Sequence, residues 1–340
     1  MYEIDFLPVG DGGRSGDAIA VRFNRPDTGA LAHVIVDAGF KDDGEALVEH
    51  VKTYYQTDSV DIAILTHPDG DHIGGMGEVL RGLNVGELWL HHLGSRGGGG
   101  LPAADAVDEL IEVAQNEGTR VAEAFAGAQA FGGALTILGP TVDYYEQLVA
   151  EQQLVSTSVA GTGRAASFGA TVTVLAQRFL AALPVEVPFG DAGGTSPRNN
   201  TSMVTLLQLE GQQLLLTADA GVPALDRALD WADENGMTVY QPAFTQLPHH
   251  GSRHNASSAL LDRILGSTRQ AQTRTAFVNV VEEAEKHPSP RVANGFMRRG
   301  YAVGATRGKA IQKGHNAPTR PGWTTLVPLQ PLDESLEDDD

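Results

Sequence analysis

The sequence predicts an α/β protein with mixed β-sheets, and two observations support that class. Short runs rich in Val, Ile and Leu, bounded by Gly, Asp and Pro, recur along the chain with helical patterns between some of them. A glycine-rich loop alone joins the first two runs, Tyr2–Pro8 and Asp17–Phe23, which indicates a hairpin. A doubly wound sheet of parallel strands alone is therefore not expected.

The other elements follow from the same patterns, taken in chain order. Short apolar runs predict further strands at Ala32–Asp37, Val60–Thr66, Val85–His91, Gly133–Pro140, Thr201–Leu209, Gln213–Thr217, Thr275–Val281 and Ala302–Thr306. Longer stretches with helical patterning predict helices at Asp43–Tyr55, after Gly75, and at Ala103–Glu117, Val142–Gln153, Asp226–Glu234, Ser257–Leu265 and Arg291–Arg299.

The chain of 340 residues is long enough for one large α/β domain, and no linker clearly divides it. We expect one domain over residues 1–325, with insertions around 94–130 and 156–198. The acidic end "LDESLEDDD" predicts a solvated, disordered tail at 326–340.

Composition restricts the function and the location. The chain has 43 acidic and 24 basic residues, a formal net charge of −19, which argues against an autonomous binder of long nucleic acid. No apolar run approaches the roughly 20 residues of a membrane helix. The start "MYEIDFLPVGDGG" lacks the basic and apolar regions of a signal peptide, so we expect a cytoplasmic protein without membrane contact. The absence of cysteine excludes thiolate metal ligands.

One segment, "LTHPDGDHIGGM", has two histidines and two aspartates directly after an apolar strand. His67, Asp69, Asp71 and His72 fall in the loop at the end of that strand, where a turn can aim several side chains at one point. Imidazole and carboxylate are common ligands of Zn²⁺, Mn²⁺ and Fe²⁺. An exposed turn capped by Asp71 is the alternative, but it explains one aspartate and neither histidine.

Two further strand ends carry the same residue types. Asp219 follows the strand in "QLLLTADAG", and His249 and His250 follow an apolar run in "FTQLPHHGS". A lone aspartate at a strand end is more typical of a turn. Three such loops that converge at one edge of a sheet would instead form a site for two metal ions.

These motifs, H-x-D-x-D-H, T-x-D and P-H-H-G-S, together resemble the metallo-β-lactamase superfamily. They are most similar to the branch that contains the hydrolase domain of DNA-uptake (competence) channel proteins and the bacterial phosphorylcholine esterases. The segments "FLPVGDGGRSGDAIAVRF", "VIVDAG", "RNNTSMVTLLQ" and "FVNVVEEAEKHPSPRV" resemble other parts of that branch, in the same order. The resemblance implies a four-layer αββα sandwich, with mixed sheets inside and helices on the outer faces.

The resemblance also implies a ligand set. It places one divalent ion, Zn or Mn, at His67 and Asp69, a second at Asp71 and His72, and Asp219 between them. His250 would be the downstream ligand and His249 would face the substrate, because neighbouring residues of an extended chain point in opposite directions unless the chain bends. Asp69 stands where most members have histidine, and the usual middle histidine is missing, so Mn²⁺ rivals Zn²⁺.

Other residues near these motifs are candidates for substrate contact. Asn200 would contact substrate or a metal, or else bond a strand edge, and His287 would contact substrate or support a turn. Ser252 is a third substrate-binding candidate, and Arg198, Arg253 and Lys286 are candidate phosphate anchors. His91 and His92 are expected at the surface.

The function predicted from this resemblance is metal-dependent hydrolysis of a phosphodiester, with Asp71 and His249 as catalytic residues. The substrate, a small molecule or a nucleic acid, stays undecided, although the acidic charge favours a small one. An ester, lactone or thioester hydrolase with the same metals is one alternative. A non-catalytic metal-binding module that works with a partner protein is another.

Overall fold

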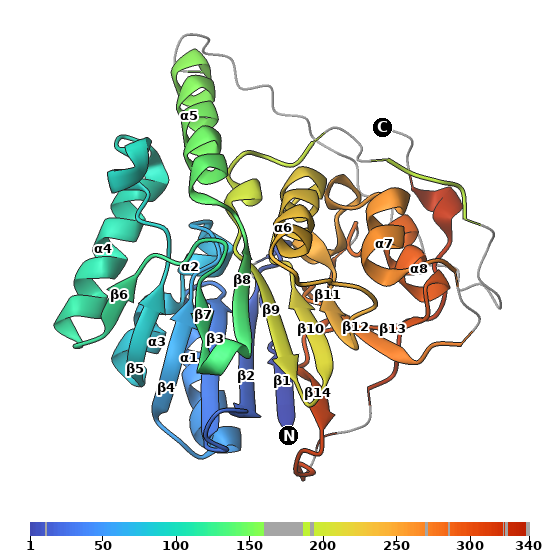
Figure 1. Ribbon diagram of the computed structural model, residues 1–340, viewed down its shortest axis with the longest axis horizontal. Helices are drawn as coiled ribbons and strands as arrows, with labels where there is room; N and C mark the ends of the chain where they lie inside the picture. Colours follow the sequence, from blue (N-terminus) through green and yellow to red (C-terminus); the bar gives the residue numbers. More distant parts are fainter. Residues whose placement is uncertain are drawn as a thin grey trace.

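The computed structural model describes residues 1–10, 12–159, 186–190, 194–268, 271–284, 286–321, 323 and 326–337. Within these residues the chain forms two seven-stranded sheets that stack face to face, with helices on both outer faces. Figure 1 shows the two halves: the N-terminal half of the chain supplies most of one sheet, and the C-terminal half supplies most of the other. The predicted four-layer αββα arrangement is confirmed.

The first sheet begins with antiparallel strands and continues with parallel ones. Its order is β14 (Ile311–His315), β1 (Tyr2–Phe6), β2 (Ala18–Asn24), β3 (Leu31–Ala38), β4 (Ser59–Ile64), β5 (Asn84–Trp89) and β6 (Arg120–Ala122). The pairs from β14 to β3 are antiparallel and those from β3 to β6 are parallel. The predicted hairpin is thus present as β1 and β2, with Tyr2 opposite Phe23.

The second sheet repeats this mixture. Its order is β13 (Tyr301–Ala305), β12 (Arg274–Val278), β11 (Phe244–Gln246), β10 (Gln212–Leu216), β9 (Val204–Leu209), β8 (Leu135–Gly139) and β7 (Gln129–Ala130). The pairs from β13 to β10 are parallel and those from β10 to β7 are antiparallel. Each sheet therefore has a block of parallel strands whose ends can carry functional loops.

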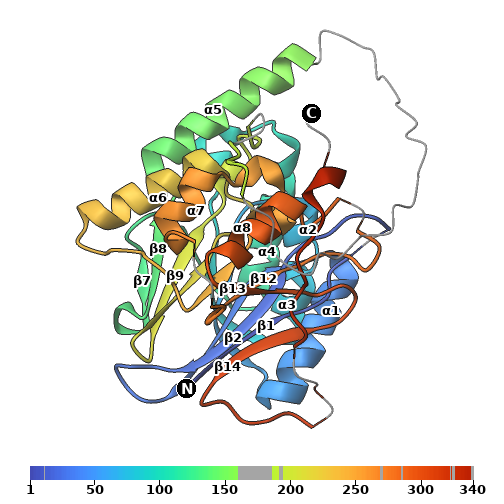
Figure 2. The same ribbon diagram turned by 90° about the vertical axis from the view of Figure 1, so that its right-hand side faces the viewer.

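Among the described residues, the three largest apolar cores hold the layers together. The central core lies between the sheets and includes Phe6, Phe244 and Phe277, whose rings pack edge to face. A second core packs the first sheet against its outer helices: α1 (Lys41–His50), α3 (Met76–Gly82) and α4 (Pro102–Asn116). A third packs the other sheet against α5 (Val142–Val159), α6 (Val222–Glu234), α7 (Ser258–Leu265) and α8 (Pro290–Arg298). Figure 2 shows α5 to α8 together on that outer face.

The described part of the C-terminal segment packs against the domain, which differs from the expected solvated tail. Leu332 is buried, and its carbonyl oxygen accepts a hydrogen bond from the side-chain amide of Asn294 at 2.8 Å. Glu334 forms an ion pair with Arg298 of α8. The segment packs here because Leu332 is apolar and because the segment's acidic side chains lie next to the arginines of α8. Residues 338–340 lie outside the described residues, as do 160–185 and 191–193 of the expected insertion.

No helix among the described residues has the length and apolar character to span a membrane.

Candidate metal centre

The predicted ligand residues come from the ends of three strands. His67, Asp69, Asp71 and His72 lie in the loop after β4 and in the short helix α2 (Gly70–Ile73) that follows it. Asp219 follows β10, and the His249–His250 pair follows β11. These strands lie in different sheets, so the loops meet at one edge of the sandwich.

The donor atoms converge on two adjacent points. Nε2 of His67 lies 3.8 Å from Oδ2 of Asp219, and Nε2 of His72 lies 3.5 Å from the same oxygen. On the other side, Oδ2 of Asp71 lies 3.9 Å from Nε2 of His72 and 3.7 Å from Nε2 of His250. One potential ligand atom from each member of these two groups lies within 4.8 Å of the others.

These spacings fit ligands that share an ion better than they fit hydrogen bonds. Separations of 3.5–3.9 Å are too long for good hydrogen bonds, and they are close to the roughly 3.4 Å between two ligand atoms that are each bound about 2.1 Å from one metal. Nε2 of His67, His72 and His250 and Oδ1 of Asp219 are buried and have no hydrogen-bond partner. Burying four polar atoms without partners at one centre costs free energy unless a cation binds them, so these residues fit divalent ions.

Each imidazole is also held from behind. Nδ1 of His72 lies 2.8 Å from Oδ2 of Asp37, and Nδ1 of His250 lies 3.1 Å from the carbonyl oxygen of Asn279. Nδ1 of His67 lies within 3.1 Å of the Thr66 hydroxyl. Bonds of this kind orient the rings and leave Nε2 for the metal, as in other protein metal sites.

The charges of the centre favour cations. Burial alone would raise the pKa of the Asp219 carboxyl, but His249, His72 and His250 outweigh it and hold that pKa well below the usual value. Burial would likewise lower the pKa of His250, yet Asp219, Asp71 and Asp17 raise it to about 9. The acidic cluster therefore favours protonated His72 and His250, whose protons divalent ions would displace.

Comparison with known families agrees with this geometry. The sequence profile of the Metallo-beta-lactamase superfamily matches residues 12–146, which include the H-x-D-x-D-H loop. Residues 12–146 are thus similar to the metallo-β-lactamase superfamily. The two mixed seven-stranded sheets with helices on their outer faces agree with the αββα sandwich that the resemblance to this superfamily implies. The predicted similarity to DNA-uptake hydrolases and phosphorylcholine esterases within it stays a prediction.

Several solved structures resemble the chain. A candidate metallo-β-lactamase from Thermotoga maritima shares 11% identity, with 72% of this chain and 94% of that chain covered and a TM-score of 0.38. A HARLDQ-motif metallo-β-lactamase from Cronobacter sakazakii shares 12%, with 64% and 60% covered and a TM-score of 0.32. A variant of the β-hydroxylase CmlA shares 10%, with 92% and 53% covered and a TM-score of 0.43. None of the curated proteins compared with the chain matches it in sequence.

The two histidines after β11 differ from the extended arrangement considered above. His249 and His250 have φ values of 47° and 55°, so the chain turns tightly there. As a result both rings face the centre: Nε2 of His249 lies 3.4 Å from Oδ2 of Asp219. The His249 side chain remains 34% exposed while His250 is 6% exposed. His250 is thus the inner residue and His249 the outer one.

Asp69 lies at the rim of the centre. One carboxylate oxygen lies 3.6 Å from Nε2 of His67, and the other accepts a hydrogen bond from Arg198 at 2.6 Å. Arg198, a candidate phosphate anchor, therefore offsets this carboxylate.

The substrate-binding candidates divide into two kinds. Oδ1 of Asn200 accepts from the backbone N–H of Gly221, so Asn200 supports the loop after Asp219. Its neighbour Asn199, which the sequence does not single out, reaches the His249 ring at 3.2 Å. Ser252 is buried, and its hydroxyl accepts from the backbone of the next turn, which stabilises the chain after His250.

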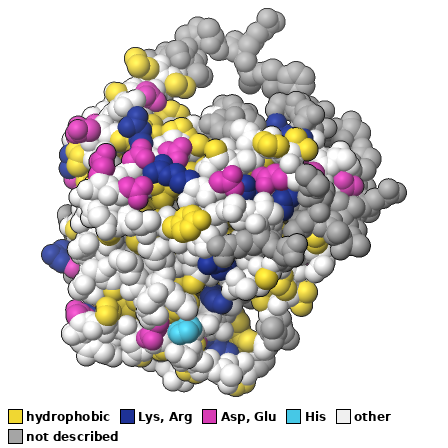
Figure 3. All heavy atoms as spheres, turned by 45° about the vertical axis from the view of Figure 1, so that its right-hand side comes forward, with side chains coloured by type: hydrophobic (Ala, Val, Ile, Leu, Met, Phe, Trp, Pro, Cys, Tyr) yellow, Lys and Arg dark blue, Asp and Glu magenta, His cyan; other side chains and the backbone are white. Residues whose placement is uncertain are grey.

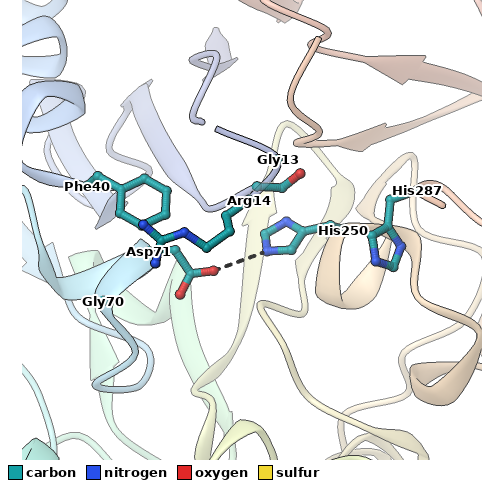
Figure 4. Close-up of a pocket in the computed structure, with 8 residues that line it drawn as sticks. Gly13, Arg14, Phe40, Gly70, Asp71, His250 and His287 are labelled. Atoms are coloured by element: carbon teal, nitrogen blue, oxygen red, sulfur yellow. Dashed lines mark ion pairs between the residues drawn. The ribbon is translucent and has the colours of Figure 1, made fainter. Parts of the chain in front are cut away.

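His287 lines a cavity of about 280 Å³ beside the centre, together with Arg14, Phe40, Asp71 and His250. Figure 4 shows the Arg14 side chain extending past the Phe40 ring towards Asp71, with His287 across the cavity. The Arg14 guanidinium carbon lies 4.9 Å from the centroid of the Phe40 ring. Burial, reinforced by His250, lowers the pKa of His287 to about 4, so this ring is neutral at neutral pH.

Sequence reasoning did not single out several supporting residues: Arg14, Asp17, Asp37, Gln246 and Asn279. A single Asp or Asn beside a strand has no distinctive spacing, so its role becomes visible only when the chain segments are brought together. The position of Asp17 directly after a glycine-rich loop is a signal that the sequence does carry. His91 also departs from the expected surface position, because it is buried against Phe125 and Tyr145.

Proposed function

We propose that this metallo-β-lactamase-fold protein is a metal-dependent hydrolase that cleaves phosphodiesters at the centre formed by His67, His72, Asp219 and His250. The observation that carries the proposal is the convergence of buried, unsatisfied Nε2 atoms and carboxylates from three separate loops. The mixed imidazole and carboxylate donors suit two ions, Zn or Mn.

Bound divalent ions would supply Lewis acidity and lower the pKa of a water molecule towards neutrality. The residues of the chain would perform the remaining tasks. Asp71 and Asp219 hold negative charge between the histidines, and Asp71 reaches both His72 and His250. His249, which is partly exposed beside Asp219, is placed to give a proton to the leaving oxygen.

The surroundings favour an anionic substrate of limited size. Arg14 brings positive charge to the wall of the 280 Å³ cavity, and Arg198 brings it to the rim at Asp69. Basic side chains on the outer helices pair with acidic neighbours, as where Arg263 of α7 pairs with Asp226, Asp230 and Asp233. Figure 3 shows basic and acidic side chains intermixed on one face of the molecule. Small phosphodiesters therefore fit better than long nucleic acid.

The test is hydrolysis of a chromogenic phosphodiester and a chromogenic ester, each with Zn²⁺ or Mn²⁺. We expect metal-dependent turnover of the diester, and a loss of about 100-fold or more in Asp219→Asn, because a ligand should matter at least as much as the residues behind it. Asp5→Asn, a buried carboxylate bonded to His50 and Tyr55, is the matched control. Turnover of the ester alone would support the ester hydrolase, and no turnover of either would contradict hydrolysis.

The cavity predicts a second, more specific effect. Because Arg14 would contact substrate through its charge alone, Arg14→Ala should raise KM for the diester about tenfold with little change in kcat. Arg81→Ala, on an exposed arginine paired with Glu78, is the control. An unchanged KM in Arg14→Ala would show that the anion binds elsewhere.

A further inference from the structure

Behind the metal centre lies a buried carboxylate that none of the steps above uses. Asp17 precedes β2 and is 1% exposed. Its Oδ2 accepts a hydrogen bond from the side-chain amide of Gln246 at 2.8 Å, and its Oδ1 accepts one from Asn279 at 3.0 Å. Both donors come from the other sheet, so Asp17 joins the two sheets directly beneath the site.

The Gln246 arm leads to Asp219. Oε1 of Gln246 accepts hydrogen bonds from the backbone N–H groups of Thr217 and Ala218, each at 3.0 Å. These are the two residues before Asp219, and Ala218 has a φ of 45° that an alanine adopts only when its surroundings enforce it. Gln246 thus fixes the turn that presents the Asp219 carboxylate, and Asp17 fixes Gln246.

The Asn279 arm leads to His250. The carbonyl oxygen of Asn279 accepts from Nδ1 of His250 at 3.1 Å, while its side-chain amide donates to Asp17. Oδ1 of Asp17 itself lies 4.0 Å from Nδ1 of His250. Through Asn279, Asp17 therefore orients the backbone carbonyl that holds the His250 ring.

The backbone of Asp17 reaches the first half of the site as well. Its N–H donates to the carbonyl oxygen of Asp71 at 3.1 Å, and its carbonyl accepts from Gly39 at 2.7 Å, two residues after Asp37. The approach requires glycine at position 16, where a Cβ would lie 2.3 Å from the Asp71 oxygen. Asp17 is thus bonded, directly or through one residue, to the loops that carry Asp37, Asp71, Asp219 and His250.

Asp17, Asp37 and His72 also form a compact group whose ligand atoms lie within 4.8 Å of one another. This group is not a third ion site, because its atoms already have partners. Both Asp17 oxygens accept from amides, Oδ2 of Asp37 accepts from the Thr66 hydroxyl, and Nδ1 of His72 is bonded to Asp37.

We propose that Asp17 is the positioning residue that sets the geometry of the metal centre across the two sheets, through the Gln246 and Asn279 arms. The inference rests on the metal centre of the proposed function but does not depend on which substrate is cleaved. Asp37 supports His72 within one sheet. Asp17, by contrast, bonds to ligand-bearing loops of both sheets.

The test is binding of Zn²⁺ and of Mn²⁺ alone to metal-free Asp17→Asn, measured by competition with a chromogenic chelator. The substitution keeps the shape of the side chain but places an amide group opposite the amide donors of Gln246 and Asn279. The Gln246 amide cannot rotate to accept instead, because its oxygen is held by two backbone N–H groups. We expect affinity for the ions to fall by about 10–100-fold. Equal affinity in the variant and the wild type would overturn the proposal.

Controls separate positioning from general stability. Asp5→Asn also alters a buried carboxylate of the first sheet and should lower the melting temperature of the metal-free protein while metal Kd stays within about twofold. Should Asp17→Asn fail to fold, Gln246→Ala and Asn279→Ala each cut one arm, and each must weaken ion binding. Wild-type affinity in both would overturn the proposal.

The outcome also distinguishes this inference from the proposed function. A wild type that binds ions but cleaves no phosphodiester would contradict the function and leave the role of Asp17 testable by affinity. A wild type that binds neither ion would contradict both.

Discussion

At the scale of single residues, the centre depends on unusual backbone conformations. Asp37, Ala218, His249 and His250 all have φ between 45° and 56°, a region that residues with a Cβ seldom adopt. Each such residue costs about 1–3 kcal/mol, which the surrounding hydrogen bonds must offset. The turn at His249–His250 shows the benefit, because it brings two consecutive rings to one centre, which an extended strand cannot do.

The two histidines should therefore respond differently to substitution. His250→Ala should remove a ligand and weaken binding of an ion, whereas His249→Ala should retain both ions and lower kcat by about 100-fold, because only proton transfer is lost. Metal content by elemental analysis, measured alongside kcat, separates the two effects. The assignment of the two histidines would be reversed if His249→Ala lost an ion while His250→Ala kept the metal content of the wild type.

His91 predicts a pH dependence of stability away from the centre. Burial lowers the pKa of His91 to about 4, while Nε2 donates to the carbonyl oxygen of Ala124. The folded state thus favours the neutral ring, so this contribution is complete above the unfolded pKa of about 6.5 and is lost as pH falls towards 4. The loss should reach about 3 kcal/mol of unfolding free energy.

Urea unfolding of the metal-free protein between pH 7.5 and 4.5 checks this expectation. His91→Gln should be less stable at pH 7.5, because it loses the stacking on Phe125, but should show a flatter profile. His92→Gln, which alters the exposed neighbour paired with Asp108, should keep the wild-type profile. Parallel profiles for wild type and His91→Gln would contradict the account.

At the scale of elements, the ends of the apolar strands were the most predictable features, and the C-terminal edge strand β14 was the least predictable. The apolar runs of β4 and β10 and the residues that follow them reveal both a strand and its functional loop. By contrast β14 has the sequence "IQKGH", which lacks an apolar alternation, and it forms only because the edge of β1 is available to pair with it. The convergence of loops from different sheets is likewise a tertiary fact that no local pattern contains.

The segment after β14 is held by one arginine. Arg320 donates to Oδ2 of Asp5 at 2.8 Å and stacks near Tyr54, Tyr55 and Trp323. Arg320→Ala should lower the free energy of unfolding by about 3–5 kcal/mol, because it leaves buried carboxylates on β1 short of positive charge. Arg320→Lys keeps the charge but loses the planar stacking, and should be intermediate in chemical denaturation. A change below about 1 kcal/mol in Arg320→Ala would show that other groups neutralise Asp5.

At the scale of the whole molecule, the layered fold explains the position of the centre. Each sheet contributes parallel strands with loops at one edge, and stacking the sheets brings those loops together. The residue patterns allowed prediction of mixed sheets and of the ligand types, because histidines and aspartates were concentrated after apolar strands, and the resemblance to the metallo-β-lactamase superfamily predicted the four layers. It did not allow prediction of Asp17 or of the Arg14 cavity, because both depend on contacts between segments far apart in the chain.

The central claim is that side chains from three loops bind ions at one point. Anomalous X-ray diffraction at the zinc edge from crystals of the zinc-loaded protein tests it most directly. We expect one peak beside His67 and Asp219 and a second beside Asp71 and His250, with Nε2 of His72 bound to one of the two, each within about 2.3 Å of its ligand atoms. An absence of peaks there, or peaks bound only to surface residues, would contradict the account.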